Sequence, residues 1–420
     1  MIAFIKNYDL QSPDELRLKF LSKPGLSPEE KEFYSNAILQ IECRQKFGRK
    51  LRNFLSGHPD FIFSSSLSGE QASHERVAAY HASLAAGCTS LVDMTAGLGI
   101  DFITLASAIS PGKGTDCMAV EMNPATAETL KANLALCGLP EAEVVNGDSL
   151  AAVRSLRPDS GRLIFADPAR RGSQDSRIYD PRQCSPDVVG AWDELLSKCG
   201  LLLVKNSPML DLKQALRLFP HTEYIHVVGV RNECKEVLIE ARAGAEFKGV
   251  KCVDFRAGGA AQTIFISASD FLGDNNGNRA DTLMTSDERS LKERLDKGMD
   301  LYLYEPNTSL MKTQCWQAPM NLFAKGSVEK LSPNSHIYVS PEHIDNFPGR
   351  VLHVDGIIGR RQIKRLKGGR YNIVTRNYPI KADALFQKIK VSPDAEKFIY
   401  GATVGVNETP ILISGTLVNY

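Results

Sequence analysis

Residues 90–104, SLVDMTAGLGIDFIT, place a short apolar run, a glycine-containing turn and a helix-like segment in direct succession. Four further apolar runs follow along the chain: MAVEM, AEVVNGD, RLIFADP and GLLLVK, with helical periodicity between most of them. Strands that alternate with helices at this spacing predict a parallel sheet with helices on both faces. The segments HVVGV (226–230) and EVLIEA (236–241) flank a short RNECK and predict a closing antiparallel hairpin.

The sequence on either side of this α/β block follows other patterns. Ser27-Pro28-Glu29-Glu30 is a helix start signal, because Ser27 can cap, Pro28 suits the first position and Glu30 can reach back. A second helix is expected from about 73 to 86, and beyond residue 245 strand and helix candidates no longer alternate regularly. We therefore predict four parts: a helical segment at 1–75, the α/β domain at 76–245, and two small α+β units at 246–335 and 336–420.

Composition narrows the class of protein. The 420 residues carry 50 basic and 49 acidic side chains, a net charge of +1, which argues against a globally basic DNA-coating protein. The nine cysteines are scattered without zinc-ligand spacing, so we expect reduced thiols in a cytoplasm and no structural metal. No apolar run approaches the roughly 18 residues of a membrane helix, and the N-terminus does not resemble a signal peptide.

Acidic residues follow three successive predicted strands: Asp93, Glu121 and Asp148. Gly97 and Gly99 let the backbone approach a ligand, and the helix behind them begins with free N–H groups. A nicotinamide dinucleotide fingerprint would need Gly or Ala where Phe102 stands, so that cofactor is disfavoured.

S-adenosylmethionine fits this pattern. Its ammonium group would lie near Asp93, Glu121 can accept both ribose hydroxyls in charge-assisted hydrogen bonds, and Asp148 can accept from the adenine amino group. The competing interpretation is that Asp93 and Asp148 merely cap helices. The predicted cofactor-binding residues are Asp93, Thr95, Gly97, Gly99, Asp101, Glu121, Met122, Asp148 and Ser149.

The segments DMTAGLGID, AVEMN, NGDS and FADPARRG together resemble class I SAM-dependent methyltransferases. More narrowly, the chain resembles a bacterial family whose members add a C-terminal THUMP-like domain. Gln71-Ala72 and Val77-Ala78 match that family's helix before the first motif, and Asp167-Pro168-Ala169-Arg170-Arg171 matches its Asp-Pro-Ala-Arg-Arg motif. YLYEPNTSLMK (302–312) and IVTRNYP (373–379) match elements of its tail.

The resemblance covers most of residues 65–420, and its implications extend those of the residues alone. It implies a Rossmann-like methyltransferase sheet, use of SAM, a ferredoxin-like unit at 246–335 and a THUMP-like unit at 336–420. Through the domain name it also implies an RNA substrate.

Asp167-Pro168-Ala169-Arg170 ends the fourth predicted strand, at the edge where open α/β sheets bind ligands. An Asp carboxylate and a carbonyl held by Pro can accept the two N–H bonds of a base amino group and free its lone pair, as in the Asp-Pro-Pro-aromatic motifs of nucleobase N-methyltransferases. This chain has Ala169 and Arg170 at the last two places. Arg170 can stack on a base or, with Arg171, bind phosphate, and the alternative is a surface ion pair.

Two further residues complete the predicted acceptor site. Tyr179 is the nearest other residue that could stack on a base, and Lys205, after the fifth strand, could orient a substrate oxygen or simply be solvated. No Cys lies in these motifs, so C5 methylation is disfavoured. The predicted catalytic residues are Asp167, Pro168, Arg170 and Lys205.

Basic residues concentrate in two segments. Residues 360–390 hold ten Lys or Arg against the single acid Asp383, with Tyr371 and Tyr378 among them, and residues 44–52 add five more basic groups. Such segments bind phosphates, although many are only solvated helix faces.

The sequence therefore predicts SAM-dependent methylation of a base nitrogen in tRNA or rRNA. The alternatives are a protein or small-molecule methyltransferase, or an RNA-binding protein with a vestigial methyltransferase fold.

Overall fold

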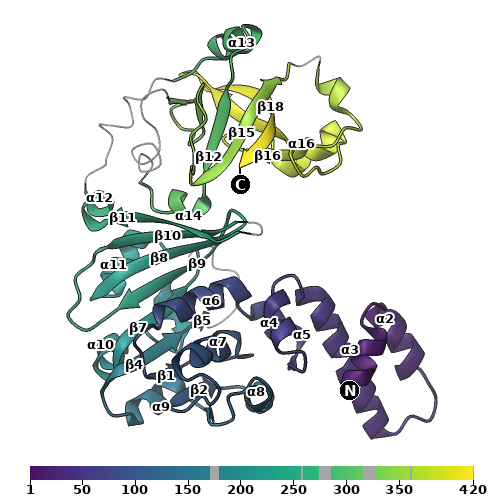
Figure 1. The fold of residues 1–420 in the computed structure, drawn as a ribbon, viewed down its shortest axis with the longest axis vertical. Coiled ribbons are helices and arrows are strands. Elements are labelled where there is room, and N and C mark those ends of the chain that lie inside the picture. The colour runs from purple at the N-terminus through teal and green to yellow at the C-terminus, as the bar shows by residue number, and fades with distance from the viewer. Residues whose placement is uncertain (171–178, 257–258, 274–284, 316–327, 360–361, 420) are drawn as a thin grey trace. The chain divides into compact units, whose positions relative to one another are not determined.

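The computed structural model describes residues 1–170, 179–256, 259–273, 285–315, 328–359 and 362–419. The chain divides into two compact units (Figure 1). The first contains Met1–Tyr224 and Val237–Phe247, and the second contains Ile225–Glu236 and Lys248–Tyr420. The chain therefore passes between the units three times, after Tyr224, after Glu236 and after Phe247.

The N-terminal part of the first unit is helical, as predicted. The capping box expected at Ser27 is present: the Glu30 N–H donates to Ser27 Oγ at 3.2 Å and the Ser27 N–H donates to the Glu30 carboxylate at 3.0 Å. The helical elements are α1 (Ile2–Tyr8), α2 (Pro13–Leu16), the π-helical turn η1 (Arg17–Leu21), α3 (Pro28–Phe47), α4 (Arg52–Gly57), α5 (Ser66–Gln71) and α6 (Glu75–Leu84).

These helices are attached to the α/β part of the same unit through a buried amide. Asn133, on α8 (Pro124–Leu136), accepts from the Ile62 N–H and donates to the Ile62 carbonyl, each at 2.8 Å. Phe61 and Phe63 on either side are 1% exposed and belong to the same hydrophobic cluster as the sheet. Because both sides of the amide are satisfied, its burial carries no penalty for unpaired groups.

A parallel sheet forms the centre of the first unit and confirms the predicted fold class. Its strands lie in the order β3-β2-β1-β4-β7, all parallel. These strands are β1 (Ser90–Asp93), β2 (Cys117–Glu121), β3 (Glu143–Asn146), β4 (Asp159–Ala166) and β7 (Cys199–Asn206). The intervening helices are α7 (Ile100–Ile109), α8, α9 (Ser149–Ser155), α10 (Trp192–Lys198) and α11 (Leu212–Leu218).

The predicted closing hairpin is also present. It consists of β8 (Thr222–Val230) and β9 (Glu233–Ala241), and β9 pairs antiparallel with β7. Only Arg231 and Asn232 form the turn, both at positive φ (52° and 61°). This two-residue turn matches the right-handed twist of the strands, so β9 begins earlier than the sequence pattern suggested.

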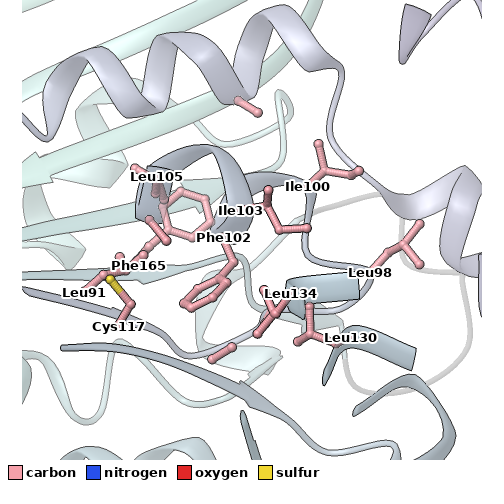
Figure 2. Packing of buried hydrophobic residues seen from close by; sticks show 14 of the residues in the cluster. Leu91, Leu98, Ile100, Phe102, Ile103, Leu105, Cys117, Leu130, Leu134 and Phe165 are labelled. Atoms are coloured by element: carbon pink, nitrogen blue, oxygen red, sulfur yellow. The ribbon is translucent and has the colours of Figure 1, made fainter. Parts of the chain in front are cut away.

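A large hydrophobic cluster of the first unit joins the sheet to α7, α8 and the helices before the sheet. Figure 2 shows Phe102 and Phe165 among Leu91, Cys117 and Leu134. Phe102 is fully buried, and Phe165 is 1% exposed. The bulky residue in the first turn of α7 is therefore part of the core.

The second unit contains a seven-stranded sheet and an antiparallel pair. The pair, β10 (Gly249–Phe255) and β11 (Ala261–Ser267), lies beside β8 and is followed by α12 (Ala268–Leu272). The sheet has the order β13-β14-β12-β15-β18-β17-β16. Its strands are β12 (Tyr302–Pro306), β13 (Glu329–Lys330), β14 (Tyr338–Ser340), β15 (Gly349–Ile357), β16 (Asn372–Thr375), β17 (Lys397–Val404) and β18 (Thr409–Asn419). Its helices are α13 (Glu288–Asp296), α14 (Thr308–Met311), η4 (Ile363–Leu366) and α16 (Ala382–Ile389).

This sheet corrects the subdivision expected for the C-terminal region. The boundary drawn between residues 335 and 336 falls inside the sheet, because β12 pairs with both β14 and β15. β10 and β11, assigned to the 246–335 unit, pair beside β8 in the other sheet. The helix expected at about 309–324 is described only as α14, and its remaining residues lie mostly outside the described ones.

No helix in the described ranges is long and apolar enough to cross a membrane. The nine cysteines all lie within the described residues and form no disulfide. Over the same residues, no group of three or more His, Cys, Asp or Glu side chains could hold a metal ion.

Candidate active site

The loop after β1 combines a buried carboxylate with two glycines at positive φ. Asp93 ends β1, is 1% exposed and accepts the Thr95 N–H at 2.9 Å. Gly97 has φ +53°, and a Cβ there would meet only the Thr95 carbonyl oxygen, at 3.9 Å. Gly99 caps α7 with φ +94°, and a Cβ there would lie 2.4 Å from the Leu130 side chain. Gly99 is thus required by packing, whereas Gly97 leaves open space above the loop.

Glu121, at the end of β2, is hydrogen-bonded to this loop. Its carboxylate accepts the Gly97 N–H at 3.0 Å through Oε2 and the Asn123 N–H at 2.7 Å through Oε1. Met122 follows it with 68% of its surface exposed. The predicted residues of the first two strand ends therefore lie together.

The end of β3 adjoins Glu121. The Asn146 side chain donates to the carbonyls of Glu121 (2.8 Å) and Met122 (3.0 Å). Asp148 caps α9, because its carboxylate accepts the Leu150 N–H at 2.8 Å. The structure therefore shows the helix-capping role that the sequence left as the alternative for this residue. Ser149 is 6% exposed, and the expected contacts of Asp148 and Ser149 with an adenine stay predictions.

The acids of the site affect one another. Burial raises the pKa of Asp93 to about 8; the Thr95 N–H opposes this, and the nearby carboxylates of Asp101, Asp167 and Glu121 add to it. Asp93 is therefore largely protonated at neutral pH in the ligand-free protein. A cation placed beside it would favour its ionised form.

Asp101 has different partners from those that the sequence suggested. It accepts from Ser73 Oγ, and its other oxygen lies 2.9 Å from His81 Nδ1. Burial raises the pKa of Asp101, but the His81 ring, the Lys205 ammonium and the Ser73 hydroxyl outweigh it and the pKa falls to about 2. Asp101 is therefore a carboxylate that links α6 to α7.

The structure brings two predicted catalytic residues into contact. Lys205 Nζ donates to Asp167 Oδ2 at 2.6 Å, and the Asp167 N–H donates to Thr95 Oγ1 at 2.7 Å. The pairing of Ala166 with Val204 places Asp167 and Lys205 side by side at the ends of β4 and β7. The Lys205 side chain is 14% exposed, so the interpretation as a solvated lysine is wrong.

After Asp167, the structure differs from the prediction at Tyr179, the residue that could have stacked on a base. Ala169 and Arg170 form the short strand β5, paired with β6 (Cys184–Ser185), and the predicted Arg171 lies outside the described residues. Tyr179 is 7% exposed and donates to Asn206 Oδ1 at 3.2 Å. Burial is the largest of the effects that raise the pKa of Tyr179. The Tyr179 ring is therefore part of the interior and is not available to stack on a base.

Two residues of the site were missed by sequence reasoning. Ser73 and His81 both contact Asp101. Ser73 lies directly after the Gln71-Ala72 pair of the family motif, but that motif is not one helix: α5 ends at Gln71 and α6 begins at Glu75. The break places Ser73 in a loop that reaches the site.

The two basic segments have different environments. Within 44–52, Arg44 donates to the Pro59 and Phe61 carbonyls, Lys46 pairs with Glu70 and Lys50 donates to the Glu70 carbonyl. These three groups therefore hold the N-terminal helices together, while Arg49 and Arg52 are exposed. The described basic residues of 360–390 are all exposed: Lys364, Arg365, Lys367, Arg370, Arg376, Lys381, Lys388 and Lys390. Of these, Arg370 pairs with Asp394 at 3.7 Å and Arg376 with Glu305 at 2.6 Å.

The second unit also holds a charged cluster beside two cavities. Glu305 accepts from Arg350 (3.0 Å) and from Tyr400, and it pairs with Arg376 at 2.6 Å. A cavity of about 290 Å³ is lined by residues that include Glu305 and Arg376, and one of about 380 Å³ by residues that include Lys381. Asn377 lines both cavities.

A family model described as a ferredoxin-like domain matches residues 302–348. No curated protein matches the chain. Among solved structures, the crystal structure of a "putative methyltransferase from Porphyromonas gingivalis W83" aligns with 100% of this chain and 97% of its own, at 26% identity and a TM-score of 0.76.

Other solved structures match only part of the chain. Cofactor-bound Rv0187 from MTB aligns with 48% of this chain and 96% of its own, at 15% identity and a TM-score of 0.32. A "putative O-methyltransferase from Klebsiella pneumoniae" aligns with 50% of this chain and 99% of its own, at 14% identity and a TM-score of 0.32.

The sheet order, the family model and the Porphyromonas gingivalis structure define the class of protein. The chain has the Rossmann-like α/β fold of methyltransferases, together with a ferredoxin-like domain in its C-terminal region. In its full length it is similar to the Porphyromonas gingivalis protein.

Proposed function

We propose that this chain is an S-adenosylmethionine-dependent methyltransferase. The observation that carries the proposal is the contact between Glu121 and the Gly97 N–H, which places a carboxylate at the end of β2 against the open glycine loop after β1. A carboxylate in such a position can accept both hydroxyls of an adenosine ribose, and a cofactor without phosphates needs no phosphate-binding lysine. The fit extends to Asp93, whose neighbouring acids favour a cation.

The chain's own residues would hold the cofactor and protect its methyl group. Glu121 would accept from the ribose hydroxyls, Asp93 and the loop carbonyls would face the ammonium and sulfonium charges, and Asp148 and Ser149 would lie toward the adenine. When bound, the cofactor supplies a methyl group on a sulfonium. Since transfer is an in-line displacement, the protein contributes mainly by positioning and electrostatics.

The acceptor that we propose is a base nitrogen in tRNA or rRNA. Asp167 and the Pro168 carbonyl would accept from the amino group, while Lys205 holds the Asp167 carboxylate and Arg170 assists. The exposed basic residues of 360–390 support an RNA partner, because they offer phosphate contacts on a chain of nearly zero net charge.

One observation favours a second candidate, a protein or small-molecule acceptor. Nucleobase N-methyltransferase motifs place an aromatic ring over the base, whereas Tyr179 is buried and Arg170 stands at the motif position. A smaller acceptor would not need that ring.

The test has two stages. Titration calorimetry with SAM should give binding to the whole chain, and no heat and no thermal shift would contradict the proposed function. Tritiated SAM is then incubated with the protein and with tRNA and rRNA from cells lacking it, followed by mass spectrometry of nucleosides. A methylated base supports the RNA acceptor, and binding of SAM without label in any RNA would favour the second candidate.

A further inference from the structure

A continuous set of hydrogen bonds runs from α6 to the acceptor site within the first unit. His81 Nδ1 lies 2.9 Å from Asp101 Oδ1, and Asp101 Oδ2 accepts from Ser73 Oγ. Lys205 Nζ donates to Ser73 Oγ at 2.9 Å and to Asp167 Oδ2 at 2.6 Å. The set thus connects residues 73, 81, 101, 167 and 205 from three helical or loop segments and two strands.

Asp101 determines which groups donate and which accept in this set of hydrogen bonds. With a pKa of about 2, Asp101 is ionised and can only accept hydrogen bonds. The single hydroxyl proton of Ser73 therefore points to Asp101, and its oxygen accepts from the Lys205 ammonium. Ser73 is 7% exposed and His81 is fully buried, so water does not compete freely for these contacts.

A lysine needs such restraint because its ammonium lies on a flexible stem with four carbons. The Asp167 side chain is 40% exposed, and the Lys205 ammonium holds its Oδ2 at 2.6 Å. A shift of the Lys205 ammonium would therefore move or release this oxygen. A misplacement of about 1 Å in a catalytic group costs up to about 100-fold in rate.

We propose that Ser73 is a positioning residue of the acceptor site, which fixes Lys205 and through it the orientation of the Asp167 carboxylate. With Oδ2 held by Lys205, the Asp167 carboxylate would keep one orientation toward the amino group of the acceptor. This inference rests on the proposed function. It assigns a role in catalysis to the loop between α5 and α6, which precedes the parallel sheet in the chain.

The test uses the full-length protein with Ser73→Ala, Ser73→Thr, Lys205→Met and the double variant Ser73→Ala/Lys205→Met. Ser83→Ala is the matched control, because Ser83 is an exposed serine on α6 whose hydroxyl donates to the Tyr80 carbonyl. The measurements are the SAM dissociation constant by calorimetry, the transfer rate at saturating SAM and RNA, and the unfolding free energy of the ligand-free protein.

Ser73→Ala should lower the transfer rate about 10- to 100-fold with SAM affinity unchanged within about twofold. Ser73→Thr keeps the hydroxyl and should recover most of the rate, while Ser83→Ala should equal the unaltered chain. Because Ser73 acts through Lys205, its removal should have no further effect on rate in the Lys205→Met background. In the ligand-free protein, the effects of the two substitutions on the unfolding free energy should likewise be non-additive.

Contrary results are distinguishable. A normal rate in Ser73→Ala, an additive loss of rate in the double variant, or a loss of SAM affinity as large as the loss of rate would each overturn the positioning role. Absence of any transfer by the unaltered chain would instead contradict the proposed RNA methylation, on which the positioning role depends. Failure of Ser73→Thr to recover the rate would also count against it.

Discussion

The Gly97 N–H donates to Glu121 Oε2 at 3.0 Å, so the glycine loop after β1 and the end of β2 are held together before any ligand is present. The carboxylate also accepts the Asn123 N–H at 2.7 Å. Binding a ribose at Glu121 therefore requires little reorganisation of the protein, because its acceptor is already oriented. Preorganisation of this kind lowers the entropic cost of binding.

Glu121→Ala should weaken SAM binding by at least about 10-fold, since it removes charge-assisted hydrogen bonds to the ribose and one restraint on the loop. Calorimetry with SAM measures the effect. Glu128→Ala is the control, because Glu128 is an exposed acid on the neighbouring helix α8. Equal affinities for the two variants would remove Glu121 from the cofactor site.

Asp167→Asn should reduce methyl transfer by about 100-fold or more while leaving SAM affinity nearly unchanged. The amide keeps the shape of the side chain but lacks the charge that pairs with Lys205 and the second acceptor oxygen. Transfer of tritium from SAM to RNA, measured beside calorimetry, checks both statements. Retained transfer would refute the assignment of Asp167, and lost binding would move it to the cofactor site.

Asp93→Asn should stabilise the ligand-free protein increasingly as the pH rises from about 4 to about 8. The folded chain holds the Asp93 proton up to a pKa of about 8, whereas the unfolded chain loses it near 3.8. Between these values the unfolded state binds fewer protons, so unfolding free energy falls as pH rises, and Asn removes this slope. Above pH 8 the difference in unfolding free energy between Asp93→Asn and the unaltered chain reaches at most several kcal/mol.

Thermal unfolding of both proteins at pH 5, 7 and 9 tests this expectation. A constant difference in melting temperature across the three values would show that Asp93 does not titrate in this window. SAM binding gives an independent check, because a cation beside Asp93 should expel its proton. The binding enthalpy of the unaltered chain at pH 7 should then depend on the ionisation enthalpy of the buffer, and that of Asp93→Asn should depend on it less.

The strand ends could be predicted from sequence because a parallel sheet brings all its carboxyl ends to one edge. This rule placed Asp93, Glu121 and Asp167 near one another without knowledge of any contact. It could not supply Ser73, since the contact between Ser73 and Lys205 joins residues 132 positions apart and depends on a break between two helices. The burial of Tyr179 likewise depends on the environment of Asn206 and cannot be inferred from residue type.

The second unit was predicted less completely for a related reason. Antiparallel strands can pair in many orders, and nothing local indicates that β12 lies between β14 and β15. Most strands of this unit coincide with apolar runs, although the two-residue β13 does not. The division at residue 335 followed sequence spacing alone and falls inside the sheet. Arg231, at positive φ in the turn between β8 and β9, also gave no signal because Arg is not a residue type that favours this conformation.

If residues 360–390 bind RNA, replacing exposed basic groups there should weaken binding uniformly across sequences. The triple variant with Lys364, Arg365 and Lys367 each replaced by Gln should reduce the slope of log affinity against log salt by about 2. Filter binding of tRNA over a range of salt concentrations measures it. Gln replacement of Arg289, Lys292 and Lys297, on and just after α13, is a control of equal charge. Equal slopes for the two triple variants would exclude this segment as an RNA contact.

Alanine substitutions at Gly97 and Gly99 should have different effects. The first should weaken SAM binding, and the second should mainly lower the stability of the protein. Gly99→Ala combines a positive φ with overlap of its Cβ with Leu130 and should destabilise the protein by about 2–4 kcal/mol. Gly97→Ala meets no overlap and should cost only about 1 kcal/mol, yet its Cβ would occupy the open space above the loop and weaken SAM binding. Gly112→Ala, also at positive φ with nothing within 4 Å, is the control for backbone strain alone. Unfolding and calorimetry on all three should show reduced SAM affinity in Gly97→Ala but not in Gly112→Ala, and equal affinities for these two would mean that no ligand lies above Gly97.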